Sequence, residues 1–230
     1  MKAWRNMVWA VAEPGVQLTV NGGGSSSVKL FLLLTVLSFA TAVLISITSF
    51  TRIVIVLSFV RQALGTPQLP PNQVVIALSL ALSAFVMAPT GTQVYQEALG
   101  PYFEDRISHE EALARASGPV RGFLLKQTRT EDLRLFYDIA KTDAPVTVDD
   151  IPLSIAIPAF MVSELTTAFR MGLFIFIPLL VIDLLVSAIL MSLGMMMVPP
   201  TLVSLPLKIG VFLLAGGWHL LAGTLVRSFA

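Results

Sequence analysis

Long uncharged stretches, separated by single charges and prolines, lie on both sides of a polar middle. The first runs over residues 30–51, between Lys29 and Arg52, and its 22 residues exceed the roughly 20 that cross a bilayer as a helix. The next two, residues 53–60 and 74–87, are shorter than the hydrocarbon core is thick. The pattern predicts one clean span, followed by shorter apolar helices that are joined by rigid turns.

After residue 150 the apolar character returns in pieces, interrupted by charges and by Pro158, Pro178 and Pro206. Irregular backbone and charge at membrane depth are tolerated only where protein or a water-filled cavity surrounds them. We therefore expect bent helical hairpins that pack against other subunits, rather than a simple four-span monomer. Only the last piece is a candidate for a second clean span. The pieces are residues 151–163, 171–182, 184–198 and 209–226.

The polar middle, residues 95–150, concentrates the charge of the chain. It holds 11 of the 14 acidic residues and 7 of the 15 basic ones. We predict a small solvated helical module without chemistry of its own. Asp149 and Asp150 would make either a two-carboxylate site or a solvated helix start, and the second is favoured because carboxylates stabilise the first turn of a helix.

Two helices are predicted inside this module. Ser108 and Glu111 have the capping-box spacing of a helix start, and residues 118–119, Gly-Pro, are its predicted stop. Glu111 is also placed to pair with Arg115 one turn later. A second capping box at residues 128–131 predicts another helix start. It precedes an apolar stripe at helical spacing, formed by Leu133, Phe136, Tyr137 and Ala140.

Residues 1–29 differ from the rest of the chain. Lys2 and Arg5 precede a short apolar run, which resembles the start of a signal peptide, and a Gly-Ser stretch at residues 22–27 has the composition of a flexible linker. The predicted organisation is therefore a targeting segment with a linker, N-terminal apolar helices, the polar module and C-terminal apolar hairpins. The boundaries are 1–29, 30–94, 95–150 and 151–230.

The amino-acid composition indicates whether this chain is a soluble or a membrane protein. Hydrophobic residues make up 55% and charged residues 13%, about half of the roughly 25% in soluble domains. Mean hydropathy is +0.82, which indicates an integral membrane protein. A net charge of +1 gives no case for nucleic-acid binding. The absence of cysteine excludes disulfides, thiol catalysis and thiolate metal sites.

Enzyme signatures are missing as well. His109-Glu110-Glu111 lacks a second histidine at zinc-binding spacing, because position 113 is Leu113. The sequence contains neither a nucleophile elbow nor a phosphate loop. We therefore predict no enzyme activity, no metal and no cofactor.

Charges flanked by apolar residues are the candidate functional groups, since an ionisable residue in such a setting marks function by default. Asp183 and Lys208 lie on opposite sides of a Met-Pro bend, so a hairpin would let them neutralise each other within or between subunits and specify packing. Glu164 and Arg170 are six residues apart and face different partners. Arg52 is either such a group or, like Arg61, a side chain that snorkels at the membrane surface.

The bend itself is Gly194-Met195-Met196-Met197-Val198-Pro199-Pro200. It places soft, polarizable side chains before two prolines that disfavour a continuous helix. The motif is either a Met-rich helix end with no function or a functional apolar loop. Further on, Gly216-Gly217 would let another helix approach closely, and Trp218 would serve as an interfacial anchor.

A dozen short motifs from about residue 30 to the end together resemble the FliP family of flagellar biosynthetic proteins. Among them are Arg52-Ile53, Ser163-Glu164-Leu165 and Ile182-Asp183-Leu184, together with the Gly194–Pro200 bend. Gly65-Thr66-Pro67, Met197-Val198-Pro199-Pro200 and Thr51-Arg52 favour the flagellar branch over the matching subunit of virulence-type injectisomes.

The resemblance implies a core pore-forming subunit of the flagellar type III export gate, in the bacterial inner membrane and the flagellar basal body. It implies a helical or ring-shaped oligomer of five copies with FliQ and FliR, contacts with FlhA and FlhB, and passage of unfolded flagellar proteins. Met195, Met196 and Met197 would form a channel gasket, and residues 95–150 would face the periplasm. The family often carries a cleaved signal peptide, and Asp183 and Lys208 fall on family charges.

Two positions depart from the family pattern. Gly216 stands where the family usually has an acid, and Thr166 stands where a lysine is common. Arg170 lies one helical turn after Thr166 and is placed to supply the missing positive charge. An alternative of a different class is an ion-coupled secondary transporter that uses Asp183 and Lys208 as a relay, but the sequence lacks the internal repeats typical of that class.

Overall fold

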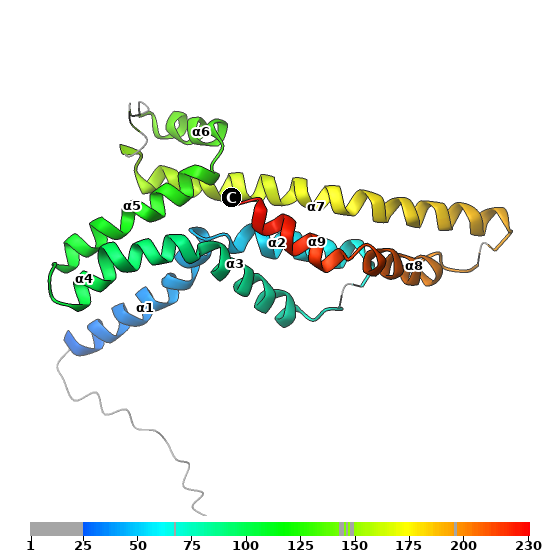
Figure 1. Cartoon of the computed structure of the whole chain (residues 1–230), viewed down its shortest axis with the longest axis horizontal. Coiled ribbons are helices and arrows are strands. Elements are labelled where there is room, and N and C mark those ends of the chain that lie inside the picture. The colour runs from blue at the N-terminus through cyan, green and yellow to red at the C-terminus, as the bar shows by residue number, and fades with distance from the viewer. Residues whose placement is uncertain (1–24, 67, 143–144, 146, 148–149, 196) are drawn as a thin grey trace, which may run out of the picture. The chain divides into compact units, whose positions relative to one another are not determined.

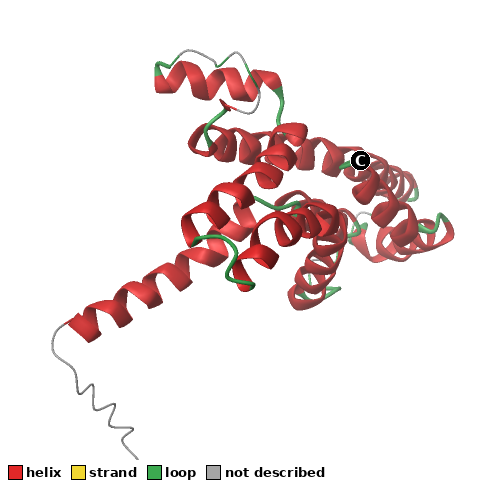
Figure 2. Ribbon diagram, turned by 60° about the vertical axis from the view of Figure 1, so that its left-hand side comes forward, coloured by secondary structure: helices red, strands yellow, loops and turns green. Residues whose placement is uncertain are grey.

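The described part of the chain is entirely helical. The computed structural model describes residues 25–230 except 67, 143–144, 146, 148–149 and 196, and it has no strand in these residues. This confirms the predicted all-α fold class, whereas most of the predicted targeting segment lies outside the described residues. Figures 1 and 2 show the helices. They are α1 (Ser25–Ser46), α2 (Phe50–Ala63), α3 (Asn72–Val94), the π-helix η1 (Tyr95–Leu99), α4 (Gly100–Phe103), α5 (His109–Gln127), α6 (Thr130–Ala140), α7 (Leu153–Ser192), α8 (Thr201–Leu214) and α9 (Gly217–Arg227).

Three helical stretches in the described residues are long and apolar enough to cross a membrane: Val28–Ser46, Asn72–Phe103 and Leu153–Ser192. The pair α8 and α9, bent by 62°, adds a fourth if it is counted as one broken span. The chain divides at residue 41 into two compact units. The packing described below lies within the second unit.

The prediction of short apolar pieces was wrong. Three of the predicted pieces join into α7, a single helix of 40 residues with Pro158 and Pro178 inside it. A proline removes only one hydrogen bond of the ladder, and neighbouring helices compensate for it in membrane proteins. The piece at residues 74–87 likewise continues through Pro89 and η1 into α4. The prolines and charges inside α3 and α7 therefore did not mark helix ends.

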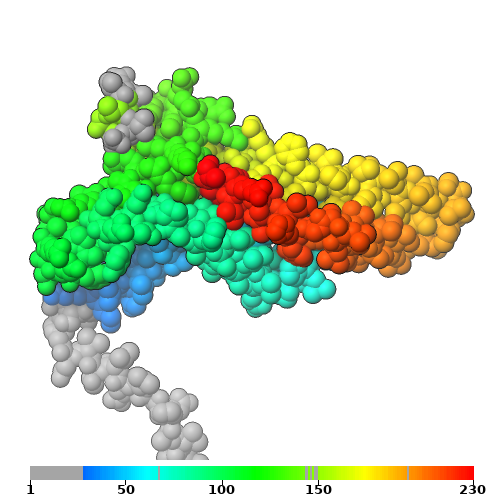
Figure 3. All heavy atoms as spheres, viewed as in Figure 1, coloured from blue at the N-terminus to red at the C-terminus, as the bar shows by residue number. Residues whose placement is uncertain are grey.

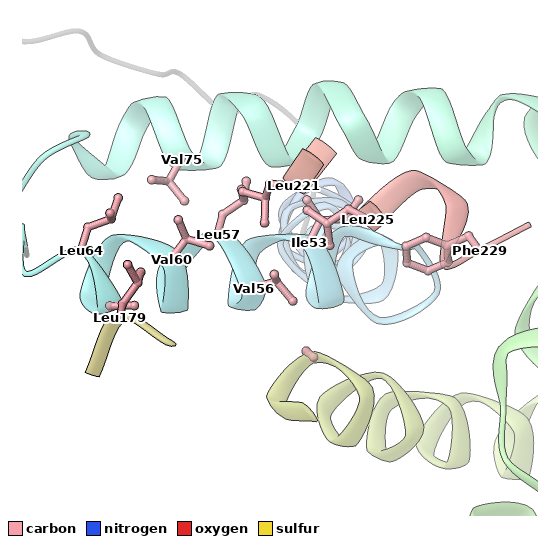
Figure 4. Close-up of a cluster of buried hydrophobic side chains, with 12 residues drawn as sticks. Ile53, Val56, Leu57, Val60, Leu64, Val75, Leu179, Leu221, Leu225 and Phe229 are labelled. Carbon is pink, nitrogen blue, oxygen red and sulfur yellow. The ribbon is translucent and has the colours of Figure 1, made fainter. Parts of the chain in front are cut away.

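Helix α2 lies at the centre of the larger apolar cluster (Figure 4). Ile53, Val56, Leu57 and Val60 repeat at helical spacing and are buried against α3, α7 and α9. The contact with α7 is close at Gly172, where an added Cβ would lie 2.6 Å from the ring of Phe59. This packing fixes α2 between the two long apolar helices.

A second apolar cluster joins the polar segment to the start of α7. It contains Leu124 of α5, Tyr137 of α6, and Ile155 and Phe160 of α7. The predicted stripe on α6 therefore supplies part of a core through Tyr137, Leu133 and Phe136, whereas Ala140 is exposed. Burial raises the pKa of the Tyr137 phenol. The four-part division of the chain stays a prediction.

The predicted helix boundaries in this segment are partly correct. The Ser108 side chain accepts a hydrogen bond from the Glu111 backbone N–H, and Arg115 pairs with Glu111 at 2.6 Å, as predicted. The stop at residues 118–119 was wrong, because α5 continues through Pro119 to Gln127. The second capping box does not form either. Thr128 instead ends α5, and its hydroxyl donates to the Leu124 carbonyl.

Several hydroxyl groups on apolar helices bond to their own helix backbone. In α1, the hydroxyls of Thr35, Ser38 and Ser46 donate to the carbonyl four residues earlier, at 2.7–2.8 Å. Ser58 in α2 and Ser79 in α3 do the same. A hydroxyl that is satisfied in this way needs no partner from water or from another helix.

Candidate functional site

The methionine bend forms the loop between α7 and α8, at the end of the hairpin that these two helices make (Figures 1 and 3). Gly194 has φ +74°, and it ends α7 in a Schellman motif. Its N–H donates to the Met191 carbonyl at 3.1 Å, and the Met195 N–H donates to the Leu190 carbonyl at 3.0 Å. The glycine, and not the prolines, stops the long helix.

The prolines act at the other end of the loop. Pro200 is the N-cap of α8, and its carbonyl accepts from the Ser204 N–H at 2.9 Å, so Pro199-Pro200 start the returning helix. Between Gly194 and Pro199, Met195 is 45% exposed and Met197 is 96% exposed. Met196 lies outside the described residues. The described part of the loop therefore presents one almost fully exposed and one half-exposed apolar side chain.

Asp183 and Lys208 are brought together across this hairpin. The Lys208 ammonium lies 2.6 Å from the Asp183 carboxylate, and it also donates to the Ala63 carbonyl at the end of α2, at 2.9 Å. Lys208 is 5% exposed. One cation thus ties α8 to α7 and caps α2, where the helix dipole favours positive charge. The pairing is within one chain. Its predicted role in assembly stays a prediction.

Arg52 and Glu164 form a second, deeper pair. The Arg52 Nε donates to Glu164 Oε2 at 2.9 Å, and Nη2 donates to Oε1 of the same carboxylate. Both residues are buried, at 2% and 0% exposure. The alternative that Arg52 snorkels at the membrane surface was therefore wrong. A bidentate geometry of this kind is what makes an ion pair tolerable in a low-dielectric interior.

The other two basic candidates, Arg170 and Arg61, do not take part in these ion pairs. Arg170 is exposed on α7 and makes no ion pair within the described residues. It does not share a partner with Glu164, which is consistent with their spacing. Arg61 bonds the Asn72 side chain and thereby joins α2 to the start of α3. Its position at a membrane surface stays a prediction.

The glycine pair at residues 216–217 makes the break between α8 and α9. Gly216, which departs from the acid expected by the family resemblance, has φ +65°, a left-handed conformation that favours glycine. An added Cβ on Gly217 would lie 2.4 Å from the ring of Phe212. That ring packs edge-on against Trp218, 5.3 Å between centroids. The close approach at this site is made by Phe212 of the preceding helix α8, which agrees with the expected approach of another helix.

Sequence reasoning missed the long-range partners. The Arg52 and Glu164 side chains meet across 112 positions, and Lys208 reaches the Ala63 carbonyl across 145. No periodicity in the sequence encodes these contacts. No group of acidic residues or histidines that could hold a metal ion occurs in the described residues.

Several span-length apolar helices, charges that pair inside the chain and no strand in the described residues are features of an integral membrane protein. Comparison with known proteins defines the family. The FliP family profile matches residues 33–225. The chain belongs to the FliP family.

Curated relatives agree with this assignment and support the predicted flagellar branch. The flagellar biosynthetic protein FliP of Bacillus subtilis (strain 168) is 53% identical over 205 residues, covering 89% of this chain and 93% of the relative. FliP of Pectobacterium carotovorum is 50% identical over 225 residues, 96% of this chain and 87% of the relative. FliP of Aquifex aeolicus is 50% identical over 219 residues, which cover 94% of this chain and 92% of the relative. The chain is thus a flagellar export component with membrane helices.

Proposed function

We propose that this chain is a pore-forming subunit of the flagellar type III export gate, and that it conducts unfolded flagellar proteins across the bacterial inner membrane. Family membership supports a role in the export apparatus. The observation that carries the pore role is the 96% exposure of Met197 in a loop between two apolar helices. An apolar side chain at the tip of a loop between two membrane-type helices is available for contact with other copies of the chain or with a passing substrate.

The dimensions of α7 support assembly with other subunits. Its 40 residues extend over about 60 Å, twice the roughly 30 Å of a hydrocarbon core. Even when the helix is tilted by up to about 40° from the bilayer normal, the usual range, it remains longer than the hydrocarbon core is thick. Part of this apolar helix therefore needs cover from protein. Exposed side chains along it include Phe169, Leu173, Phe174 and Ile177.

Several copies around one axis would bring their Met195, Met196 and Met197 side chains into a ring. Thioethers repack at low cost, so such a ring seals against water and still yields to an unfolded chain. The partners in this proposal are further copies of the chain, five by the family resemblance, with FliQ and FliR, and with FlhA and FlhB nearby. Residues 95–150 would face the periplasm.

The test replaces Met195, Met196 and Met197 together by alanine. Loop substitutions of this kind change folding stability by only about 0.5 kcal/mol, so the protein should still accumulate in the membrane. Ion leak through the gate should rise, because alanine leaves the ring open. The measurement is ion flux into vesicles that carry the assembled gate.

The matched control is Met191→Ala, an exposed methionine that precedes the loop on α7. It should leave the barrier unchanged. An unchanged barrier in the triple variant would reject the gasket, and equal leak in both variants would locate the seal elsewhere.

A further inference from the structure

The guanidinium of Arg52 makes more bonds than its ion pair requires. An arginine has five N–H donors in a planar fork. Two of them bind Glu164, as described above. A third, on Nη2, donates to Gln127 Oε1 at 3.2 Å. Both donors on Nη1 reach Ser228, its carbonyl at 2.9 Å and its hydroxyl at 3.0 Å. All five donors of the buried cation therefore have acceptors.

The residues around Ser228 are held by further contacts with the same group. We call residues 225–229 the latch segment. The Phe229 ring lies over the guanidinium, 3.8 Å from Cζ to the ring centroid, and it stacks on Phe123 of α5. Gln127 accepts from Arg52 and donates through Nε2 to the Phe229 carbonyl at 3.0 Å. Leu225 is 0% exposed within the cluster around α2 (Figure 4).

Neutralising Glu164 does not explain this arrangement. The compact ammonium of a lysine would be enough to neutralise the Glu164 carboxylate. Only the planar guanidinium of arginine can bind a carboxylate on one edge and a backbone carbonyl on another. The acceptors come from three separate elements: Glu164 from α7, Gln127 from α5 and Ser228 from the residue that follows α9. The fork therefore holds the end of α9 at the place where α2, α5 and α7 meet.

We propose that Arg52 is a positioning residue that locks the latch segment, and with it the far end of α9, onto α2, α5 and α7. The helix pair α8 and α9 is then fixed at two places, by Lys208 in α8 and by Arg52 beyond α9, on either side of the break at Gly216. In the export gate, this lock would fix the helix pair α8 and α9, which follows the methionine loop. That consequence rests on the proposed function. The lock itself does not.

The absence of cysteine in this chain allows a direct test with single spin labels. Arg227→Cys carries a label in the last turn of α9, and Lys126→Cys carries one in the last turn of α5. Both positions are exposed basic residues near helix ends. The full-length protein in lipid nanodiscs is then compared with and without Arg52→Lys. Lysine keeps the charge that faces Glu164 and removes the fork.

In Arg52→Lys, the mobile fraction of the label at position 227 should rise about tenfold, since the loss of even one charge-assisted hydrogen bond shifts an equilibrium by about that factor. The label at position 126 should keep its line shape. A position-227 spectrum identical to that of the parent would overturn the proposal, as would equal loosening at both positions. Neither outcome depends on export or leak, so failure of the lock and failure of the pore role remain distinguishable.

A second variant covers the case in which Arg52→Lys does not fold. The double change Arg52→Met with Glu164→Met replaces the ion pair by apolar side chains of similar length, which is often neutral for folding. The lock predicts a mobile label at position 227 in this folded, uncharged variant. If charge neutralisation were the only role of Arg52, the label would stay immobile and the proposal would be rejected.

Discussion

At the scale of a single residue, the buried hydroxyl of Tyr137 allows a prediction about stability. Its hydroxyl is buried and has no hydrogen-bond partner in the described residues. Removing such a group relieves a desolvation cost, so Tyr137→Phe should stabilise the protein by about 1 kcal/mol. That change corresponds to a rise of about 2–4 °C in Tm for a chain of this length. Thermal unfolding in detergent micelles measures it.

Tyr102→Phe is the control, because Tyr102 on α4 is exposed, unlike Tyr137. Its Tm should stay within about 1 °C of the parent, as for most surface changes. A clear loss of stability in Tyr137→Phe would mean that the hydroxyl has a partner outside the described residues.

Residue partners could be predicted only where the chain itself brings them close. Asp183 and Lys208 were expected to pair because they bracket one bend, and the structure places them at 2.6 Å. Arg52 and Glu164 were recognised as unusual charges, but not as partners. Their contact depends on α2 packing between α3 and α7, and that packing is decided by buried apolar area, which has no signature at either charged position.

At the scale of elements, Gly194 decides where α7 ends. Its positive φ costs an L residue about 1 kcal/mol, so Gly194→Ala should destabilise the α7–α8 hairpin by about that amount. It should also extend α7 toward the methionines and raise ion leak in the assembled gate. Chemical unfolding and the vesicle flux assay measure the two effects.

Gly122→Ala is the matched control within a helix. Gly122 lies inside α5, and a Cβ added there meets nothing within 4 Å. Alanine is the better helix former, so this variant should gain about 1 kcal/mol and leave the leak unchanged. The prediction for Gly194 fails if the two glycine changes have the same sign.

Element boundaries were the weakest sequence predictions, and α7 shows why. Pro158 and Pro178 were interpreted as breaks, yet both lie within a continuous helix. A lipid or protein environment without competing water makes backbone hydrogen bonds costly to abandon, so the helix continues past a proline. Capping signals were more reliable where solvent reaches the backbone, as at Ser108.

At the scale of the whole molecule, the exposed apolar surface predicts an oligomer. Native mass spectrometry of the protein, extracted from membranes in mild detergent, should show a multiple of the 24.8 kDa chain mass. The physical reason is the apolar length of α7, which exceeds the thickness of the bilayer and leaves large side chains such as Phe169 and Phe174 exposed. A stable monomer would contradict both the assembly and the pore role.

That this chain is an all-helical membrane protein could be predicted from composition and hydropathy, since its mean hydropathy is +0.82 and residues 30–51 form an uncharged stretch of span length. The arrangement of these helices could not, because α2 becomes central only through contacts far along the chain. The roles proposed for Met195, Met196 and Met197 would depend on other copies of the subunit, which a single sequence does not describe.

The internal pairing of charges and hydroxyls has a consequence for how the gate is built. Both ion pairs, Arg52–Glu164 and the partly exposed Lys208–Asp183, close within one chain, and the α1 hydroxyls bond to their own backbone. A newly inserted copy would therefore bring these groups into the bilayer already paired, whereas Arg170 is exposed without an ion pair in the described residues, and it could meet other copies by lateral diffusion. Recruitment then depends on shape and apolar contact, so the rate of gate formation should follow the surface density of free subunits.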